Sequence, residues 1–413
     1  MVIISNGFNK FHLAVAAAEM EKKGLLSLLI SGAYPTNFID YIKVLPFLKK
    51  NARFNRLLAR GEEISERRVK ALWFSELIHV MRLIPEHLGC IGISDCLDAF
   101  SFRLYGYFAA KALFKAPANA RIYHYRSGFG GKSVNAAKRL GMITICDHSI
   151  VHPAVFSYLV NNGGKMPVAG QMGQMNRLWM QILLDIEQAD VVLVNSEFVK
   201  NTFVHMGWDP AKIYVIYLGV DEQFLRNLPL INFQHEIKSR PLRLIFAGSF
   251  ETRKGAEVLI AALKLIRGHS WQLEIAGGIN KVIKRKNASF FKDPRVKYLG
   301  RLTRSELAQR ICTSDVFVFP SLAEGSARVI FEALAAGCYI ITTPNSGSIV
   351  KDGVNGTLVF PNDADCLAEA IQRAILQPKK VKEVGLYNAK IVRMLYKQEH
   401  YGNELYKLYC SFI

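Results

Sequence analysis

Two glutamates, Glu324 and Glu332, stand eight residues apart on either side of a turn of small residues, Gly325–Ala327. One apolar run, Val316–Pro320, precedes them, and a second, Tyr339–Thr343, follows. A strand, a small-residue turn, a helix and another strand form a βαβ unit. Ligands of such units bind beyond the carboxyl ends of the strands, so we expect both carboxylates to face a ligand site.

The same turn can also bind an anion. We expect Glu324 in the loop after the strand and Glu332 about two turns into the helix. The N–H groups of Gly325 to Arg328 have no partner inside that helix, and together with the helix dipole they form a phosphate site. A carboxylate repels a phosphate unless it faces hydroxyl groups of the same ligand. A nucleotide-sugar is such a ligand, because it has a phosphate centre with hydroxyl groups on both sides. A helix with two ordinary surface glutamates is the alternative that the spacing alone leaves open.

Composition indicates a large ordered protein. The chain has 413 residues, half of them hydrophobic, which predicts two domains with their own cores. No apolar run approaches the roughly 18 residues of a membrane span, and the start, Met1–Gly7, has no basic region of a secretory signal. The seven scattered cysteines predict reduced, mostly buried thiols of a cytosolic protein.

The βαβ pattern occurs twice. It opens with the strand Val2–Ser5 and the helix His12–Lys23, and it restarts at the strand Leu242–Ala247. We therefore expect an α/β protein of two Rossmann-like domains, at residues 1–222 and 223–395, joined by a polar connection from 222 to 240. The last segment, 396–413, is expected to be a helix that returns to the first domain.

At this point the motifs resemble a known family. The sequence E-G-S-A-R-V-I-F-E-A-L-A-A-G, Glu324–Gly337, resembles the Glu-x7-Glu signature of retaining glycosyltransferases of family 4. Phe246–Gly255, Val192–Ser196 and Ile216–Asp221 extend the resemblance, which is dense from about 186 to 376. It implies the GT-B fold, in which two Rossmann-like domains face each other across a cleft. It also implies sugar transfer from a nucleotide diphosphate with retention, in bacterial surface or exopolysaccharide assembly.

The resemblance also implies roles for residues on the donor side. Glu324 would contact the sugar, Glu332 the ribose hydroxyls and Lys254 the diphosphate. Ser249 stands where many relatives have an arginine, and Arg253 is expected to compensate. The predicted donor-binding residues are Gly248, Ser249, Arg253, Lys254, Gly277, Arg301, Glu324, Gly325, Ser326, Ala327, Arg328 and Glu332. His148, Lys254 and Glu324 are the predicted catalytic residues. The nucleobase stays open.

Polar residues after two strands of the first domain predict the acceptor side: Gly7, Lys10, His12, Asp147 and His152. His148 matches a family histidine that hydrogen-bonds donor sugar or acceptor, and His152 is its rival. A metal site at Asp147, His148 and His152 is disfavoured because the spacing is no recognised zinc pattern. Asp363 and Asp365 resemble a metal-binding DxD motif, but their place before a helix predicts an N-cap. We expect no cofactor and no metal, only a nucleotide-sugar as co-substrate.

The net charge of +19 indicates either a polyanionic partner, such as nucleic acid, anionic lipid or a phosphorylated substrate, or a role in solubility. Basic and large apolar residues alternate from 41 to 84, which favours a helix in an anionic membrane interface. A helical insertion packed on its own domain is the alternative. We expect a cytoplasmic protein that the 41–84 segment holds on the inner face of the membrane, near a glycan or lipid-linked acceptor, without nucleic acid. Two other functions stay open: a GT-B hydrolase, epimerase or phosphorylase of nucleotide-sugars, and a non-catalytic basic protein that binds nucleic acid or membrane.

Overall fold

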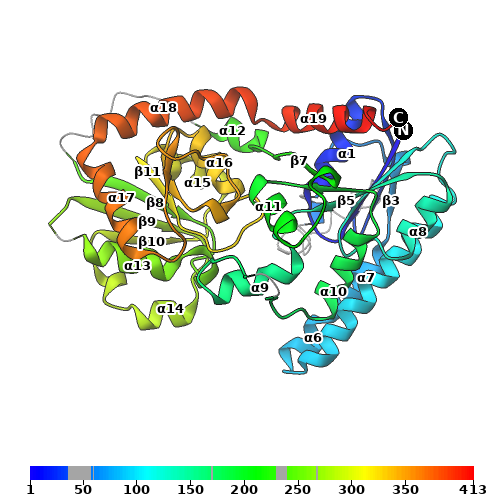
Figure 1. The fold of residues 1–413 in the computed structure, drawn as a ribbon, viewed down its shortest axis with the longest axis horizontal. Helices are drawn as coiled ribbons and strands as arrows, with labels where there is room; N and C mark the ends of the chain where they lie inside the picture. The colour runs from blue at the N-terminus through cyan, green and yellow to red at the C-terminus, as the bar shows by residue number, and fades with distance from the viewer. Residues whose placement is uncertain (36–56, 59, 169–170, 229–239, 267) are drawn as a thin grey trace, which may run out of the picture.

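The computed structural model describes residues 1–35, 57–58, 60–168, 171–228, 240–266 and 268–413. It contains two α/β domains, each built on one parallel sheet with helices on its faces, as the sequence predicts (Figure 1). Residues 229–239 of the predicted connection lie outside the described residues, as do 41–56 and residue 59 of the predicted membrane segment.

The first sheet has the order β3-β2-β1-β4-β5-β6-β7. Its strands are β1 (Val2–Gly7), β2 (Leu26–Ser31), β3 (Val69–Ala71), β4 (Ile122–Arg126), β5 (Ile143–His148), β6 (Val191–Val194) and β7 (Ile213–Val215). All of these neighbouring strands are parallel. Most of them are short, nearly continuous apolar runs, because helices cover both faces of a parallel sheet.

The helices of the first domain are α1 (His12–Lys22), α5 (Trp73–Met81), α6 (Leu83–His87), α7 (Ile91–Leu113), α8 (Lys132–Arg139), α9 (Pro153–Asn161), α10 (Arg177–Glu187) and α11 (Glu197–His205). The sequence pattern alone predicts a long helix over Gln171–Gln188, but α10 begins only at Arg177. The helix starts later because the Asn176 side chain accepts a hydrogen bond from the Trp179 N–H and caps it.

The second sheet has the order β10-β9-β8-β11-β12-β13. Its strands are β8 (Leu242–Ala247), β9 (Trp271–Ala276), β10 (Val296–Gly300), β11 (Val316–Phe319), β12 (Tyr339–Thr342) and β13 (Gly356–Leu358). The helices are α12 (Glu222–Asn227), α13 (Ala256–Leu265), α14 (Lys281–Lys286), α15 (Arg304–Cys312), α16 (Arg328–Ala335), α17 (Ala364–Leu376) and α18 (Pro378–Leu395). Asp363 caps α17 through the Cys366 N–H, which confirms the predicted N-cap.

The strand order places a ligand crevice in the second domain. β8 and β11 are neighbours, whereas the chain continues from β8 to β9 on one side and from β11 to β12 on the other. The loops that follow β8 and β11 therefore separate, and they leave a crevice beyond the carboxyl ends of the strands. The predicted motifs at Gly248–Gly255 and Ser321–Arg328 follow these two strands.

The last helix, α19 (Gln398–Cys410), lies on the first domain. Tyr401, Leu405 and Tyr409 are buried there with strand residues such as Val2 and Ile4. Figure 1 shows α18 and α19 spanning both domains, with the two termini close together. The chain thus crosses between the domains a second time.

Two expectations about composition have different outcomes. In the part of the chain that the structure describes, no helix is long and apolar enough to cross a membrane. All seven cysteines are free thiols, but the expectation that most are buried is wrong, since Cys90, Cys96 and Cys410 are exposed and only Cys146 and Cys338 are buried.

Candidate active site

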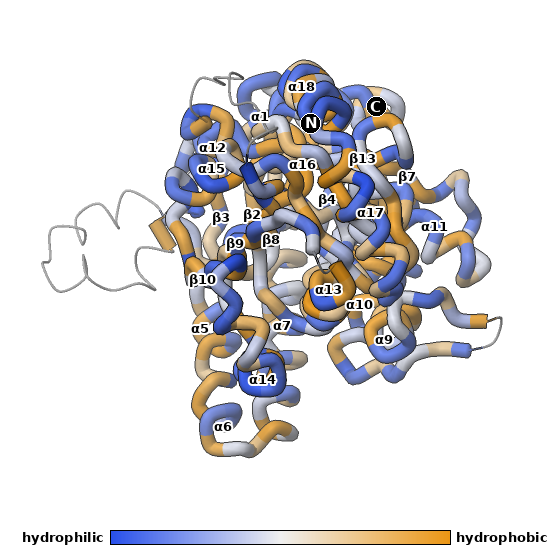
Figure 2. Tube along the Cα trace, turned by 90° about the vertical axis from the view of Figure 1, so that its left-hand side faces the viewer, coloured by the Kyte–Doolittle hydropathy of each residue, from blue (hydrophilic) through white to orange (hydrophobic). Residues whose placement is uncertain are grey.

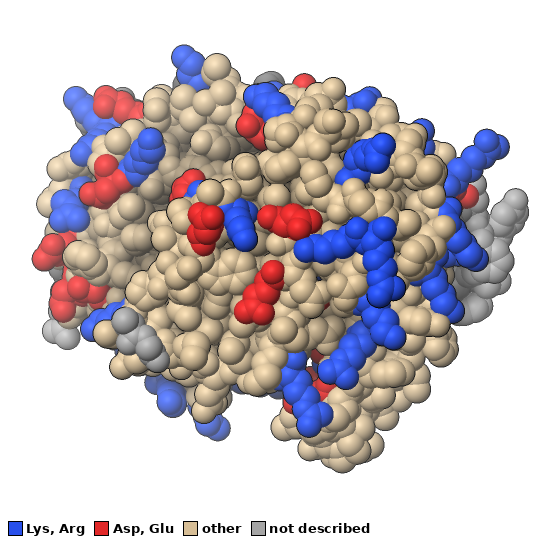
Figure 3. Space-filling model, turned by 45° about the vertical axis from the view of Figure 1, so that its right-hand side comes forward, with Lys and Arg blue, Asp and Glu red and all other residues tan. Residues whose placement is uncertain are grey.

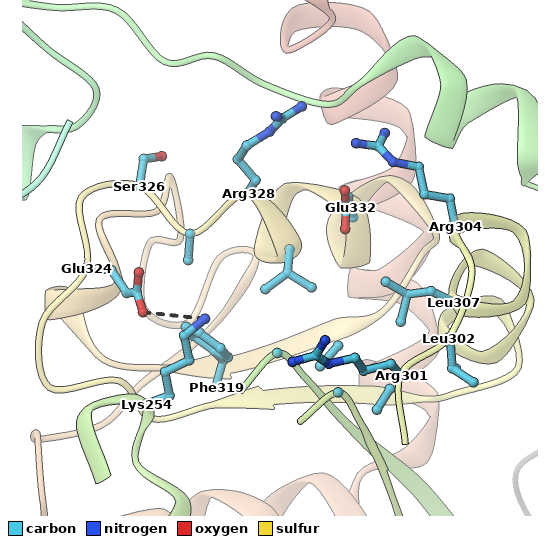
Figure 4. A pocket seen from close by; sticks show the side chains of 16 residues that line it. Lys254, Arg301, Leu302, Arg304, Leu307, Phe319, Glu324, Ser326, Arg328 and Glu332 are labelled. Atoms are coloured by element: carbon cyan, nitrogen blue, oxygen red, sulfur yellow. Dashed lines mark ion pairs between the residues drawn. The ribbon is translucent and has the colours of Figure 1, made fainter. Parts of the chain in front are cut away.

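A cavity of about 510 Å³ occupies the predicted crevice, and we call it the glutamate cavity (Figure 4). Of the predicted donor-binding residues it is lined by Gly248, Lys254, Gly277, Arg301, Glu324, Ser326, Ala327, Arg328 and Glu332. They come from the segments that follow β8, β9, β10 and β11, so the fold brings together residues that are far apart in the sequence.

The charges in the glutamate cavity favour a multiply charged anion. Lys254, Arg301, Arg304 and Arg328 all line it, against the two carboxylates. The Lys254 ammonium lies 3.8 Å from the Glu324 carboxylate and 5.4 Å from the centre of the Phe319 ring. Four cations around one concave space attract a ligand with two or more negative charges.

Two glycines form the floor of this cavity. Gly248 and Gly277 have φ angles of +133° and +132°, which glycine adopts without strain. A Cβ on Gly277 would lie 2.0 Å from the Gly248 carbonyl oxygen, so the turn at Gly277 has no room for a side chain. A ligand can therefore approach the backbone closely at this point.

Glu332 lies one turn into α16, because the helix begins at Arg328 rather than near Gly325. The prediction of two turns is wrong. Its carboxylate points into the cavity in Figure 4. Burial raises the pKa of Glu332 to about 7, although the nearby Arg328 and Arg304 lower it. Near neutral pH this group can therefore exchange a proton when a ligand binds.

The N-terminus of α16 offers fewer free donors than the sequence predicts. The Ala327 N–H donates to the Ser346 carbonyl at 3.0 Å, so it is not available to a ligand. The Glu324 N–H is likewise bound by the Asn345 carbonyl at 3.0 Å. These bonds fix the loop that carries Glu324 and leads into α16, so that the carboxylates of Glu324 and Glu332 face the same cavity.

Three predicted donor residues do not line the cavity. Arg253 donates a hydrogen bond to the Glu324 carboxylate at 2.7 Å and thereby fixes the position of that carboxylate. Ser249 is exposed in its loop. Gly325 touches the first domain: its carbonyl accepts a 2.5 Å hydrogen bond from Ser196, and a Cβ would lie 1.8 Å from the Ser149 carbonyl oxygen.

A second cavity of about 250 Å³ lies between the domains, and we call it the histidine cavity. Three of the predicted acceptor-side residues, Lys10, His12 and Asp147, line it, and their role toward an acceptor stays a prediction. Ser326 and Arg328 line both cavities. The end of the loop before α16 and the first residue of that helix therefore form the boundary between the two cavities.

Asp147 is the centre of a buried polar network. His12 donates from Nε2 to the carboxylate at 2.9 Å, and His124 Nε2 lies 3.6 Å away. Nδ1 of His124 pairs with the Tyr409 hydroxyl of α19 at 2.6 Å. Burial would raise the pKa of Asp147, but the His12 and His124 rings outweigh it and hold the pKa well below its ordinary value. Asp147 is therefore an anion that fixes the His12 ring.

His148, the predicted catalytic histidine, is buried and lines neither cavity. Its ring nitrogens lie 2.9 Å from the Ser127 hydroxyl and 3.2 Å from the Val151 carbonyl. Burial lowers the pKa of His148 to about 4, so the ring is neutral at pH 7. This position suits a side chain that positions the loop after β5, and direct contact with a substrate stays a prediction.

Two predicted acceptor-side residues also lie away from the cavities. The side chain of His152 caps α9 by accepting from the Ala154 N–H, and its ring packs on Phe203. Burial lowers the pKa of His152 to about 3. Gly7 ends β1 with a φ of +76°, against the ring of Phe129. Both residues shape the backbone beside the site.

Sequence reasoning missed Arg304 and the use of Asp221. Arg304 donates to the Asp221 carboxylate at 2.7 Å, and Arg328 lies 3.4 Å from the same group. Burial would raise the pKa of Asp221, but these arginines lower it. Asp221 thus holds two cavity cations in place. The sequence contained a signal for both residues, since Asp221 ends the motif Ile216–Asp221 and Arg304 comes shortly after the strand β10.

Two models of known protein families match the chain. The model "Glycosyl transferases group 1" matches residues 229–391, and "Glycosyltransferase Family 4" matches residues 98–224. An uncharacterised glycosyltransferase, MJ1607, of Methanocaldococcus jannaschii is 29% identical over 222 residues, which are 51% of this chain and 57% of that protein. The capsular polysaccharide biosynthesis glycosyltransferase CapM of Staphylococcus aureus is 26% identical, over 46% of this chain and 51% of its own. The alignments thus span little more than half of these relatives.

Solved structures match over the full length. The crystal structure of Anabaena HepE in complex with UDP superposes with a TM-score of 0.63 at 14% identity, over 100% of both chains. At this identity the likeness shows the fold, which is GT-B. The two family models and the relatives together show that the chain belongs to glycosyltransferase family 4. The predicted fold class and family are confirmed.

Proposed function

We propose that this protein transfers a sugar from a nucleotide-diphosphate sugar, with retention at the anomeric carbon, to a glycan or lipid-linked acceptor. The observation that carries the proposal is the glutamate cavity, where four cations surround two carboxylates beyond β8 and β11. HepE was solved with UDP and glucose, and CapM is named for capsular polysaccharide biosynthesis. These relatives support a place in bacterial surface or exopolysaccharide assembly.

Lys254 and Arg301 would bind the diphosphate and stabilise the charge that develops on it as the sugar leaves. Glu332 would accept hydrogen bonds from the ribose hydroxyls. Glu324 would orient the sugar rather than attack it, because its charge is already compensated by Arg253 at 2.7 Å and Lys254 at 3.8 Å. Since these cations can neutralise the leaving group, we propose that no metal ion is needed, which activity in excess EDTA tests.

The acceptor would enter through the histidine cavity. Its attacking hydroxyl must reach the sugar near Ser326 and Arg328, where the two cavities adjoin. His12, held by Asp147, lines this cavity and can bind that hydroxyl. We also propose that the protein works in the cytoplasm, at the inner face of the membrane, where lipid-linked acceptors are present.

A thermal-shift panel of UDP, GDP and ADP sugars tests the donor site. One of them should raise the melting temperature of the native protein and leave Lys254→Ala almost unchanged. Product analysis by NMR, with and without an extract of lipid-linked glycans, then tests the reaction. Transfer with the anomeric configuration of the donor supports the proposal. Release of free sugar or an epimer, unchanged by acceptor, would instead indicate the hydrolase or epimerase alternative.

A further inference from the structure

α5 has the reverse of the usual polarity of a surface helix. Its buried residues are polar: Ser75 and Glu76 are 0% and 4% exposed. Its apolar residues face outward, with Phe74 60% and Leu77 56% exposed. A helix in an aqueous protein normally buries its apolar face. The apolar face of α5 therefore calls for a partner outside the domain.

The exposed apolar face continues into α6. Phe74, Leu77, Met81, Ile84 and Leu88 follow one another at intervals of three and four residues, and all are exposed. This spacing places side chains on one side of a helix. Figure 2 shows apolar residues along the projection formed by α5, α6 and the start of α7. We call these five residues the α5–α6 stripe.

α7 adds a second exposed row that mixes aromatic and basic side chains. Ile93, Phe100, Tyr107 and Phe114 recur every seven residues and are all exposed. The ammonium groups of Lys111 and Lys132 lie 4.6 and 5.5 Å from the centre of the Tyr107 ring. Such amphipathic aromatic and basic side chains are typical of the zone where a membrane meets water.

The projection itself carries the exposed acidic side chains Glu86 and Asp95, but the chain after Asp98 is basic. From Ala99 to Cys146 the sequence contains eight Lys and Arg residues and no Asp or Glu. Figure 3 shows Lys and Arg side chains gathered in a band on the side of the molecule that carries α7 and α8. A surface of this kind attracts anionic lipid headgroups.

We infer that the α5–α6 stripe and the exposed row of α7 form a docking surface for an anionic lipid bilayer. A bilayer offers both acyl chains for the stripe and negative headgroups for the Lys and Arg residues between Ala99 and Cys146. A second copy of this chain would bring two sets of these basic residues together, at a cost in repulsion. Nucleic acid would neutralise the basic residues but leave Leu77, Ile84 and Leu88 in water.

The docking surface is connected to the histidine cavity. Glu76 of α5 accepts a 2.7 Å hydrogen bond from Arg60, which also donates to Asn9 at 3.2 Å. The ring of His79 lies 5.0 Å from that of Phe8. Residues 8 and 9 belong to the same loop as Lys10 and His12 of the cavity. Docking would therefore hold the opening for the acceptor at a fixed place beside the membrane. Only this last consequence depends on the proposed function.

Co-sedimentation with vesicles tests the inference. The protein is mixed with vesicles of phosphatidylcholine alone or with phosphatidylglycerol, at low and physiological salt. We expect binding to the phosphatidylglycerol vesicles and a loss of about tenfold or more in the triple variant Phe74→Ser/Leu77→Ser/Met81→Ser. Arg103→Glu/Lys111→Glu/Lys115→Glu should remove the dependence on phosphatidylglycerol. All six of these side chains are exposed, so the substitutions should leave the fold intact.

A matched control uses equally exposed apolar residues of the second domain. Phe360 and Leu376 are 73% and 69% exposed, and Phe360→Ser/Leu376→Ser should bind vesicles like the native chain. Equal loss in this control, or no vesicle binding by the native chain at low salt, would overturn the inference. A concentration-dependent dimer that the triple variant abolishes, without vesicle binding, would identify a second copy as the occupant. Thermal shifts with the nucleotide-sugar should be the same in all variants, which separates this test from that of the proposed function.

Discussion

The pH dependence of donor binding tests the role of Glu332 directly. In the free protein burial raises the pKa of this carboxyl from 4.5 to about 7. If the ribose hydroxyls donate to the carboxylate, the bound form lowers the pKa again, and binding releases a proton. Affinity should then rise with pH up to about 7 and stay constant above it.

The magnitude follows from the shift. A pKa change from 4.5 to about 7 means that the site raises the free energy of the ionised form by about 3 kcal/mol relative to the protonated form. Glu332 is partly exposed to the cavity, so this is an upper limit. With full recovery of the ionised form in the complex, affinity approaches a tenfold fall for each pH unit well below 7, which gives about 15-fold between pH 7 and 5.5 because half of the groups are already protonated at pH 7. Glu332→Gln should bind about 10- to 100-fold more weakly at pH 8, with no such slope.

Isothermal titration calorimetry with UDP-glucose, or whichever nucleotide-sugar the thermal-shift panel selects, measures this effect. An intact nucleotide-sugar is preferred to UDP because a terminal phosphate itself titrates near pH 6. Repeating the titration at pH 7 in buffers of different ionisation enthalpy counts the released protons. A flat pH profile for the native protein, or the same slope in Glu332→Gln, would refute the reasoning.

The ligand-free protein provides a second readout. The pKa of Glu332 is higher in the folded than in the unfolded state, so its contribution to stability is present below pH 4.5 and is lost as pH rises to about 7. Glu332→Gln should therefore be more stable than the native protein at pH 8, but not at pH 4.5. Thermal unfolding at both values checks the sign.

Three further substitutions test other parts of the site. Lys254→Ala should lower kcat/KM about 10- to 100-fold, because a hydrogen bond to a charged group is lost, while Lys254→Arg should recover part of it in a transfer assay. Gly325→Ala would place a Cβ 1.8 Å from the Ser149 carbonyl oxygen, so it should destabilise the domain contact by about 1–3 kcal/mol; Gly92→Ala, with open space around it, is the control in chemical denaturation. Leu405→Ala removes a fully buried side chain that holds α19 to the first domain, and it should cost about 2–5 kcal/mol of unfolding free energy; an unchanged denaturation midpoint would contradict this packing.

Local patterns predicted most of the fold. β8 has the predicted bounds, Leu242–Ala247, because short apolar runs in a parallel sheet end where polar turn residues begin. Errors occurred where a helix boundary depends on contacts. α16 begins at Arg328 because its preceding loop is bound by the Asn345 and Ser346 carbonyls, which no local pattern of that loop contains.

The sequence by itself determined the family, the two-domain fold and the chemical types on the donor side. Glu324, Glu332 and Lys254 occur in local motifs, and parallel strands bring their carboxyl ends to one edge. Only the tertiary structure decided what those groups contact. Asp147 meets His12 across 135 residues of sequence, and Arg253 binds Glu324 instead of facing the cavity. The polarity of α5 likewise depends on which side packs against α7. Such contacts join residues far apart in the chain, and their distances follow from packing rather than from spacing.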